Sequence, residues 1–154
     1  MSSFRADADR EAGPSAAGGD VEGVRRAAKG LVTGSSRVLL VRERHADGDP
    51  FWTLPGGGVR PTESLAEGLR REFAEELSCG AVVDDLVATF PYAHRGSSRL
   101  SVYGVFDCAV TAAVDPVRGE GILATRWVPP RQPPARTLPQ VQHLLAGLET
   151  DRLR

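Results

Sequence analysis

Three glutamates and one arginine lie within the six residues Arg71–Glu76, near the middle of the chain. Glu72, Glu75 and Glu76 are spaced by three and four positions, so on a helix they project from neighbouring parts of one surface. Carboxylates this close repel one another unless a cation or a proton lies among them. Such oxygen clusters suit Mg²⁺ or Mn²⁺, which also take phosphate oxygens as ligands. The pattern therefore predicts a divalent metal held against a diphosphate.

A glycine-rich segment precedes the glutamates. Gly56–Gly58 follows an apolar-aromatic strand, Phe51–Thr53. Consecutive glycines can adopt positive φ and bring the backbone close to a ligand. We therefore expect a loop here, with the Gly57 carbonyl as a further metal ligand.

The sequence also predicts the helix that positions the glutamates. Ser64 and Glu67 have the spacing of a capping box, which starts a helix. Arg71 can pair with Glu75 one turn later, and Glu63 lies just before the helix. An apolar stripe recurs every four residues and should face the core: Leu65, Leu69, Phe73 and Leu77.

The spacing of these residues decides against the simpler alternative. A helix rich in Glu and Arg is more often a solvated surface with charge pairs. From Gly57 onward, however, the sequence reads G-x5-E-x7-R-E-Φ-x-E-E, where Φ is apolar. If each residue type occurs about once in fifteen positions, this arises by chance on the order of once in ten million starts.

This stretch resembles the Nudix box of the Nudix hydrolases, G-x5-E-x7-R-E-U-x-E-E-x-G-U, where U is a bulky apolar residue. Ser78 and Cys79 depart from the last Gly and the last U. The resemblance implies that the metal ligands are the three glutamates of Arg71–Glu76, one of them doubling as the general base. It also implies that Gly57, Glu63 and Arg71 position the loop, and we expect Arg71 to orient Glu75.

The predicted order of elements is rich in strands. We expect strands at Val24–Thr33, Arg37–Arg44, Ala81–Tyr92 with a kink at Asp84–Asp85, Arg99–Val110 and Ile122–Val128, and a last helix at Pro139–Leu148. This order suits an α+β fold, an α/β/α sandwich around a mixed β-sheet. The resemblance implies that the two helices flank the sheet.

Composition sets the remaining bounds. The chain has 154 residues, a net charge of −1 and two cysteines. This length suits a single domain. The small net charge produces no electrostatic field that would favour nucleic acid or a membrane, and two cysteines are too few for a disulfide framework. We expect a cytoplasmic protein, with residues 1–19 as a flexible tail and 20–154 as the Nudix domain. By resemblance it could be a homodimer.

Several residues outside the box are candidates for substrate contact or catalysis. Arg42 and Arg44 point to the same side of a strand and could reach a phosphate, although two solvated arginines are equally consistent. Trp52 and Tyr103 could stack on a base, but core packing is the stronger expectation for both rings. Some members of the family that the chain resembles take a base from a downstream loop, so Glu120 is a candidate base. A solvated loop glutamate without a catalytic role is the stronger expectation.

The resemblance implies hydrolysis of a phosphoanhydride in a nucleoside diphosphate derivative. The expected substrate is a small nucleotide, a nucleoside di- or triphosphate cleaved to the monophosphate, and nucleotide sugars stay open. Two alternatives are a non-catalytic nucleotide-sensing module and an enzyme acting on a prenyl diphosphate. The first is disfavoured because the glutamate set is intact. The second needs an active-site cysteine outside the box, for which Cys108 is the only candidate.

Overall fold

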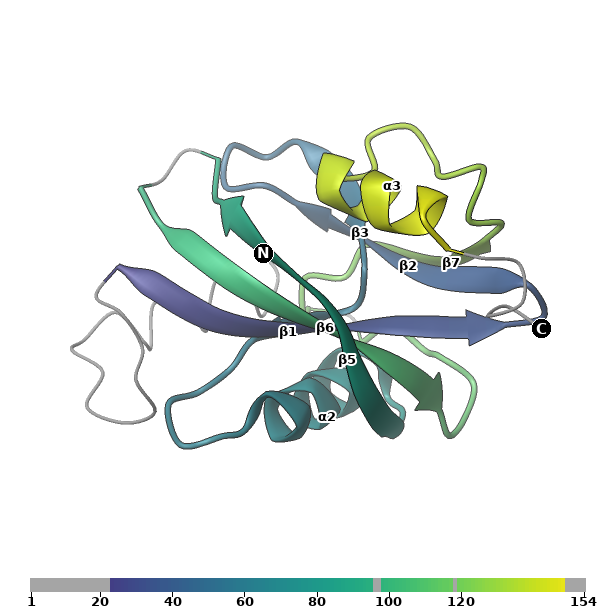
Figure 1. Ribbon diagram of the computed structural model, residues 1–154, viewed down its shortest axis with the longest axis horizontal. Helices are drawn as coiled ribbons and strands as arrows, with labels where there is room; N and C mark the ends of the chain where they lie inside the picture. The colour runs from purple at the N-terminus through teal and green to yellow at the C-terminus, as the bar shows by residue number, and fades with distance from the viewer. Residues whose placement is uncertain (1–22, 96–97, 118, 149–154) are drawn as a thin grey trace.

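The fold is a mixed seven-stranded sheet with one helix on each face, seen in a computed structural model that describes residues 23–95, 98–117 and 119–148 (Figure 1). The sheet runs in the order β3-β2-β1-β6-β5, with β4 added to β1 and β7 added to β2. The predicted α+β sandwich around a mixed sheet is confirmed. The predicted tail, residues 1–19, lies outside the described residues, as do parts of the predicted domain 20–154.

The observed helices and strands lie close to the predicted positions. They are β1 (Val24–Gly34), β2 (Arg37–Arg44), β3 (Pro50–Thr53), β4 (Gly56–Gly58), α2 (Leu65–Leu77), β5 (Ala81–Ala93), β6 (Leu100–Val110), β7 (Ala124–Val128) and α3 (Pro139–Ala146). The kink expected at Asp84–Asp85 is confirmed, because the register of β5 against β6 shifts between Val83 and Leu86.

One local prediction was wrong. Gly56–Gly58 was expected to be a loop, but it forms the short strand β4, antiparallel to β1. Its partners are Ala27, Ala28 and Lys29, which lie far away in the sequence. The pairing is possible because β2 pairs with β1 only at Thr33 and Gly34, which leaves the same edge of β1 open to β4 at Ala27–Lys29.

The long strand β1 is the centre of the sheet. It pairs in parallel with β6 over Val24–Val32 and antiparallel with β2 at its far end, where Ser35 and Ser36 form the turn with positive φ. Side chains alternate between the two faces of a strand. Ala27 belongs to the cluster beneath α3, and its neighbour Ala28 to the cluster beneath α2.

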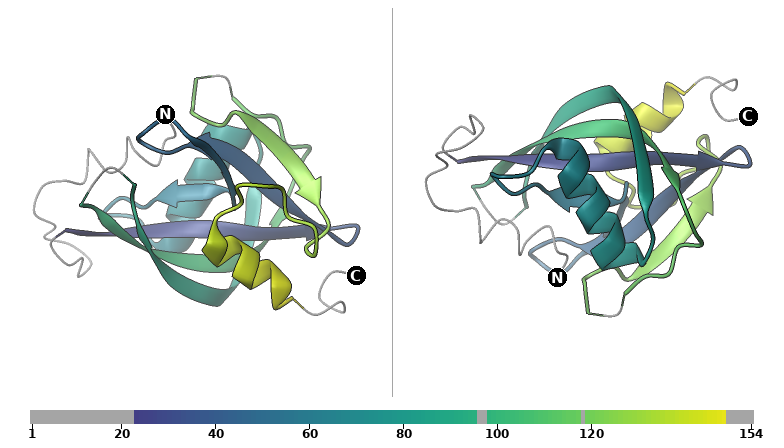
Figure 2. Two further views of the ribbon diagram at one scale, coloured as in Figure 1. Left: turned by 90° about the horizontal axis from the view of Figure 1, so that it is seen from above. Right: turned by 90° about the horizontal axis from the view of Figure 1, so that it is seen from below.

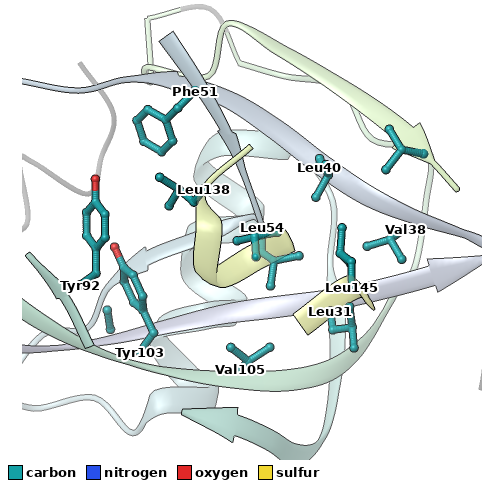
Figure 3. Close-up of a cluster of buried hydrophobic side chains, with 13 residues drawn as sticks. Leu31, Val38, Leu40, Phe51, Leu54, Tyr92, Tyr103, Val105, Leu138 and Leu145 are labelled. Atoms are coloured by element: carbon teal, nitrogen blue, oxygen red, sulfur yellow. The ribbon is translucent and has the colours of Figure 1, made fainter. Parts of the chain in front are cut away.

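Each helix closes one of these two cores. In Figure 2, α3 lies in front of the sheet when the molecule is seen from above, and α2 lies in front when it is seen from below. Figure 3 shows the α3 side, where Leu138 and Leu145 pack beside Leu54 and the rings of Tyr92 and Tyr103. On the other side the apolar stripe of α2 is buried as predicted, at Leu69, Phe73 and Leu77.

Neither described helix combines the length and apolar character that a membrane crossing requires.

Candidate active site

Helix α2 begins with the predicted capping box. The Glu67 backbone N–H donates to Ser64 Oγ at 3.1 Å, and the Ser64 N–H donates to Glu67 Oε1 at 2.8 Å. Both bonds satisfy N–H groups that the first helical turn leaves without partners. The capping box fixes where the helix begins, and the packing of Leu69, Phe73 and Leu77 in the core sets which face points inward.

The three glutamates of the helix differ in exposure. Glu72 and Glu76 are buried, with 0% and 1% of their surface exposed, and they lie one turn apart. The Glu75 side chain is 37% exposed. Burying a carboxylate is costly unless it is paired or hydrogen-bonded. The helix therefore places two buried carboxylates beside one carboxylate that water can reach.

Arg71 is the centre of the polar contacts around these glutamates. Its Nη1 donates to Glu72 Oε2 at 2.9 Å and to Glu75 Oε1 at 3.1 Å. Its Nε and Nη2 donate to the two oxygens of Glu63, and Nη2 also donates to the Gly58 carbonyl. The expected Arg71–Glu75 pair is confirmed, and the guanidinium joins it to the loop before the helix.

These contacts shift the pKa values of both partners. Burial by itself would lower the pKa of Arg71, but the hydrogen bonds that it donates to Glu63 and the charge of Glu72 raise it above its usual value. Burial by itself would raise the pKa of Glu63, but hydrogen bonds from Arg71 and the Arg60 backbone N–H lower it. Both groups are therefore charged at neutral pH.

The glycine segment packs directly against the glutamates. A Cβ added to Gly57 would lie 2.8 Å from Glu72 Oε1, so any side chain there would displace this carboxylate. Gly56 has φ +131°, and a Cβ there would collide with the Ala28 carbonyl and lie 2.9 Å from Lys29 Cα. The segment is held between β1 and α2 with no room for side chains.

The donor set suits a hard divalent cation, since it consists of oxygen atoms beside a close-packed backbone. Among the described residues, however, no three His, Cys, Asp or Glu side chains converge on one point. Arg71 lies between Glu72 and Glu75 and binds both. The residues fit a metal by type and position, and binding it would require the carboxylates to turn toward one centre.

Outside the box, Arg42 and Trp52 lie directly opposite each other in the register of β2 and β3, so their side chains share a face. Arg42 is exposed and Trp52 is half-buried. Arg44 is also exposed, and its Nη1 donates to the Gly48 carbonyl at 2.9 Å, which closes the loop between the two strands. These three residues stay candidates for substrate contact.

Tyr103 lies in the core. It is 1% exposed, its ring stacks on Tyr92 with centroids 5.9 Å apart, and Phe90 meets it edge to face. Figure 3 shows the two tyrosine rings side by side. No face of the Tyr103 ring is open to a base, so we place it among the core residues and not among the substrate contacts.

Glu120 is half-buried in the loop between β6 and β7. This loop is tied to the end of α2, because the Val117 N–H donates to the Glu76 carbonyl at 2.9 Å. The Glu120 N–H donates to the Val117 carbonyl. The loop thus reaches the end of the glutamate helix, and a role for Glu120 as base stays a prediction.

Two cationic side chains of β1, the half-buried Arg26 and the buried Lys29, were not predicted from the sequence. Arg26 Nη2 donates to the carbonyls of Arg60 and Glu63, and Lys29 Nζ donates to the Gly56 carbonyl at 3.1 Å. Lys29 also lies 3.9 Å from the buried Glu43. A signal was present, since the only lysine of the chain stands inside an apolar strand, where charge is rare.

Similar proteins were found at the level of sequence and of structure. A nucleoside triphosphatase NudI from Salmonella paratyphi B is 32% identical over 93 residues, which are 53% of this chain and 63% of that protein. This chain therefore matches less than two thirds of that relative's length.

Solved structures share the fold. A MutT NUDIX hydrolase from Burkholderia pseudomallei is 20% identical with a TM-score of 0.72, covering 82% of this chain and 98% of that one. A MutT protein from Methanosarcina mazei Go1 is 24% identical with a TM-score of 0.69, covering 84% and 94%. The family model of the NUDIX domain matches residues 23–146, most of the chain, so the chain belongs to the NUDIX domain family.

Proposed function

We propose that this protein hydrolyses the phosphoanhydride linkage of a nucleoside di- or triphosphate and releases the monophosphate, with Mg²⁺ or Mn²⁺ as its metal. The observation that carries the proposal is the Arg71 guanidinium, which binds Glu72, Glu75, Glu63 and the Gly58 carbonyl together. The NudI relative, described as a nucleoside triphosphatase, supports a nucleotide substrate.

The residues have separate roles in this proposal. Glu72, Glu75 and Glu76, with the Gly57 carbonyl, would hold the metal, which when bound neutralises phosphate charge and makes water more acidic. Glu75 is the one exposed carboxylate of the three and takes the proton of the attacking water. The water oxygen forms a bond to phosphorus as the bridging P–O bond breaks. The nucleoside monophosphate then separates from phosphate, for a diphosphate substrate, or from pyrophosphate, for a triphosphate.

The chain's other residues bind and orient. Arg71 orients the Glu75 carboxylate through the 3.1 Å hydrogen bond that its Nη1 donates to Oε1. The exposed guanidinium of Arg42 is suited to phosphate oxygens, and the neighbouring Trp52 ring to the flat face of a base. A homodimer and a cytoplasmic location stay predictions from the sequence.

A product-resolved hydrolysis screen tests the proposal. It covers nucleoside di- and triphosphates, oxidised nucleotides, nucleotide sugars and prenyl diphosphates, each with Mg²⁺ or Mn²⁺. We expect metal-dependent release of a monophosphate, reduced about 100-fold or more in Glu75→Gln. The matched control is Glu67→Gln, which changes a glutamate of the same helix that touches only the cap.

Two outcomes would contradict the proposal. Wild-type turnover in both Glu75→Gln and Glu76→Gln would show that these glutamates neither bind an essential metal nor act as the base. No turnover across the panel, combined with tight nucleotide binding, would instead support the sensing module.

A further inference from the structure

We propose that Lys29 is a positioning residue, whose buried ammonium holds the Gly56 carbonyl and so keeps the Gly56–Gly58 backbone in place against the Glu72 carboxylate. The inference rests on the proposed function, because it concerns the geometry of the same metal site. It adds a residue of β1 that lies outside the Nudix box.

The glycine segment has few anchors of its own. Strand β4 is three residues long and has no side chains to pack, and Gly56 departs from strand geometry with φ +131°. Its backbone is paired with β1, and two side-chain donors reinforce this pairing. Lys29 Nζ donates to the Gly56 carbonyl from β1, and Arg71 Nη2 donates to the Gly58 carbonyl from α2, both at 3.1 Å.

Gly57 therefore lies between two cation–carbonyl hydrogen bonds. Its backbone also lies against Glu72, since a Cβ added to Gly57 would be 2.8 Å from the carboxylate oxygen Oε1. A hydrogen bond to a charged donor is roughly twice as strong as one between neutral groups. Loss of the Lys29 bond would leave the Gly56 end with its backbone pairing to β1 alone and let the segment move relative to Glu72.

Lys29 is buried beside a carboxylate and an aromatic ring. The side chain is 1% exposed, with Glu43 Oε2 3.9 Å from Nζ and the Tyr103 ring centroid 5.3 Å away. Glu43 is 0% exposed. A buried ion pair can often be replaced by apolar residues without loss of stability. Positioning of the Gly56 carbonyl gives Lys29 a role that does not depend on a gain in stability.

The test compares the single variant Lys29→Met with the double variant Lys29→Met/Glu43→Leu. The single variant leaves Glu43 buried without this partner, so its unfolding midpoint should fall. The double variant removes both charges, so its unfolding midpoint should return close to that of the wild type. It still lacks the donor to Gly56, and this difference separates positioning from stability. Leu31→Val, a core change in the same strand, is the matched control.

Two readouts follow the site itself. Mn²⁺ affinity, measured without substrate from the electron paramagnetic resonance signal of the free ion, should fall about tenfold or more in the double variant. Amide hydrogen exchange of Gly57 and Gly58 should become faster. With the substrate found by the screen, kcat should fall by a similar factor while KM changes less than twofold. The Leu31→Val control should match the wild type in all of these.

The outcomes distinguish this inference from the proposed function. Wild-type Mn²⁺ affinity and amide exchange in a stable double variant would overturn the positioning role. If the wild-type protein neither binds Mn²⁺ nor hydrolyses any substrate, the proposed function fails. In that case amide exchange at Gly57 and Gly58 still decides whether Lys29 holds the segment.

Discussion

Arg71 and Glu63 form a two-pronged ion pair, with Nε donating to Oε2 at 2.7 Å and Nη2 donating to Oε1 at 2.9 Å. The planar guanidinium can turn little once both bonds are made. Its remaining nitrogen, Nη1, is thereby directed at Glu72 and Glu75. Through Arg71, Glu63 is thus connected to both carboxylates.

We therefore expect Glu63→Gln to reduce kcat about 10- to 100-fold, because a neutral amide holds the guanidinium less firmly. Steady-state kinetics on the substrate from the screen measures this effect. Glu67→Gln, four residues away, weakens the helix cap but should keep kcat within about twofold. Equal kcat values for the two variants would contradict an orienting role for Glu63.

Substitution of the two neighbouring glycines should separate folding from activity. In Gly57→Ala the new Cβ meets the end of the Glu72 side chain, which can shift, so we expect a stability loss of about 1 kcal/mol or less. Turnover should nevertheless fall at least tenfold, because the displaced group is a proposed metal ligand. Urea unfolding together with an activity assay measures both effects.

Gly56→Ala is the contrasting variant. Its Cβ meets the backbone of Ala28 and Lys29 at φ +131°, and neither can move without opening the sheet. We expect a loss of about 3 kcal/mol or more. A Gly56→Ala protein as stable as Gly57→Ala would show that the segment is less tightly held than its contacts indicate.

Ser78 closes α2 in the left-handed conformation, with φ 55° and ψ 32°. This is the position where the sequence departs from the final glycine of the Nudix box. A Cβ is disfavoured in this conformation, so Ser78→Gly should stabilise the protein by about 0.5–1 kcal/mol. Calorimetry should show a higher Tm with unchanged kcat. Ser78→Ala retains the Cβ and should give no gain, and a gain as large as that of glycine would argue against backbone strain.

His94 should make stability depend on pH. Burial, with the charges of Arg25 and Lys29, lowers its pKa to about 4, and its Nε2 lies 2.7 Å from Ser101 Oγ. As pH falls below about 6.5, the unfolded chain binds a proton at His94 that the folded protein does not bind until about pH 4. Stability should therefore decrease between these values, by up to about 2 kcal/mol at pH 5.

Denaturant unfolding at pH 7 and pH 5 measures this effect, with His94→Gln as the comparison. The variant should lose less stability over this interval, because its amide does not titrate. Parallel pH dependence in the two proteins would assign the loss to other groups, such as His45, whose pKa burial also lowers.

The glutamate helix and nearly all strand positions could be predicted from local patterns in the chain. These features depend on local patterns: the Ser64–Glu67 capping box, the apolar repeat ending at Leu77, and the buried run in β2. Each of them favours the same conformation before any distant contact forms. The same local pattern predicted the Arg71–Glu75 pair, because residues four apart on a helix are neighbours.

Tertiary structure decided the rest. It made Gly56–Gly58 a strand through pairing with β1, enclosed Tyr103 in the core, and brought Lys29 to Glu43 and to the Gly56 carbonyl. Each of these contacts joins segments that the sequence separates by many residues. Local propensity carries no information about such pairings, because a glycine run, a tyrosine or a lysine suits several environments until the sheet and the two helices close around it.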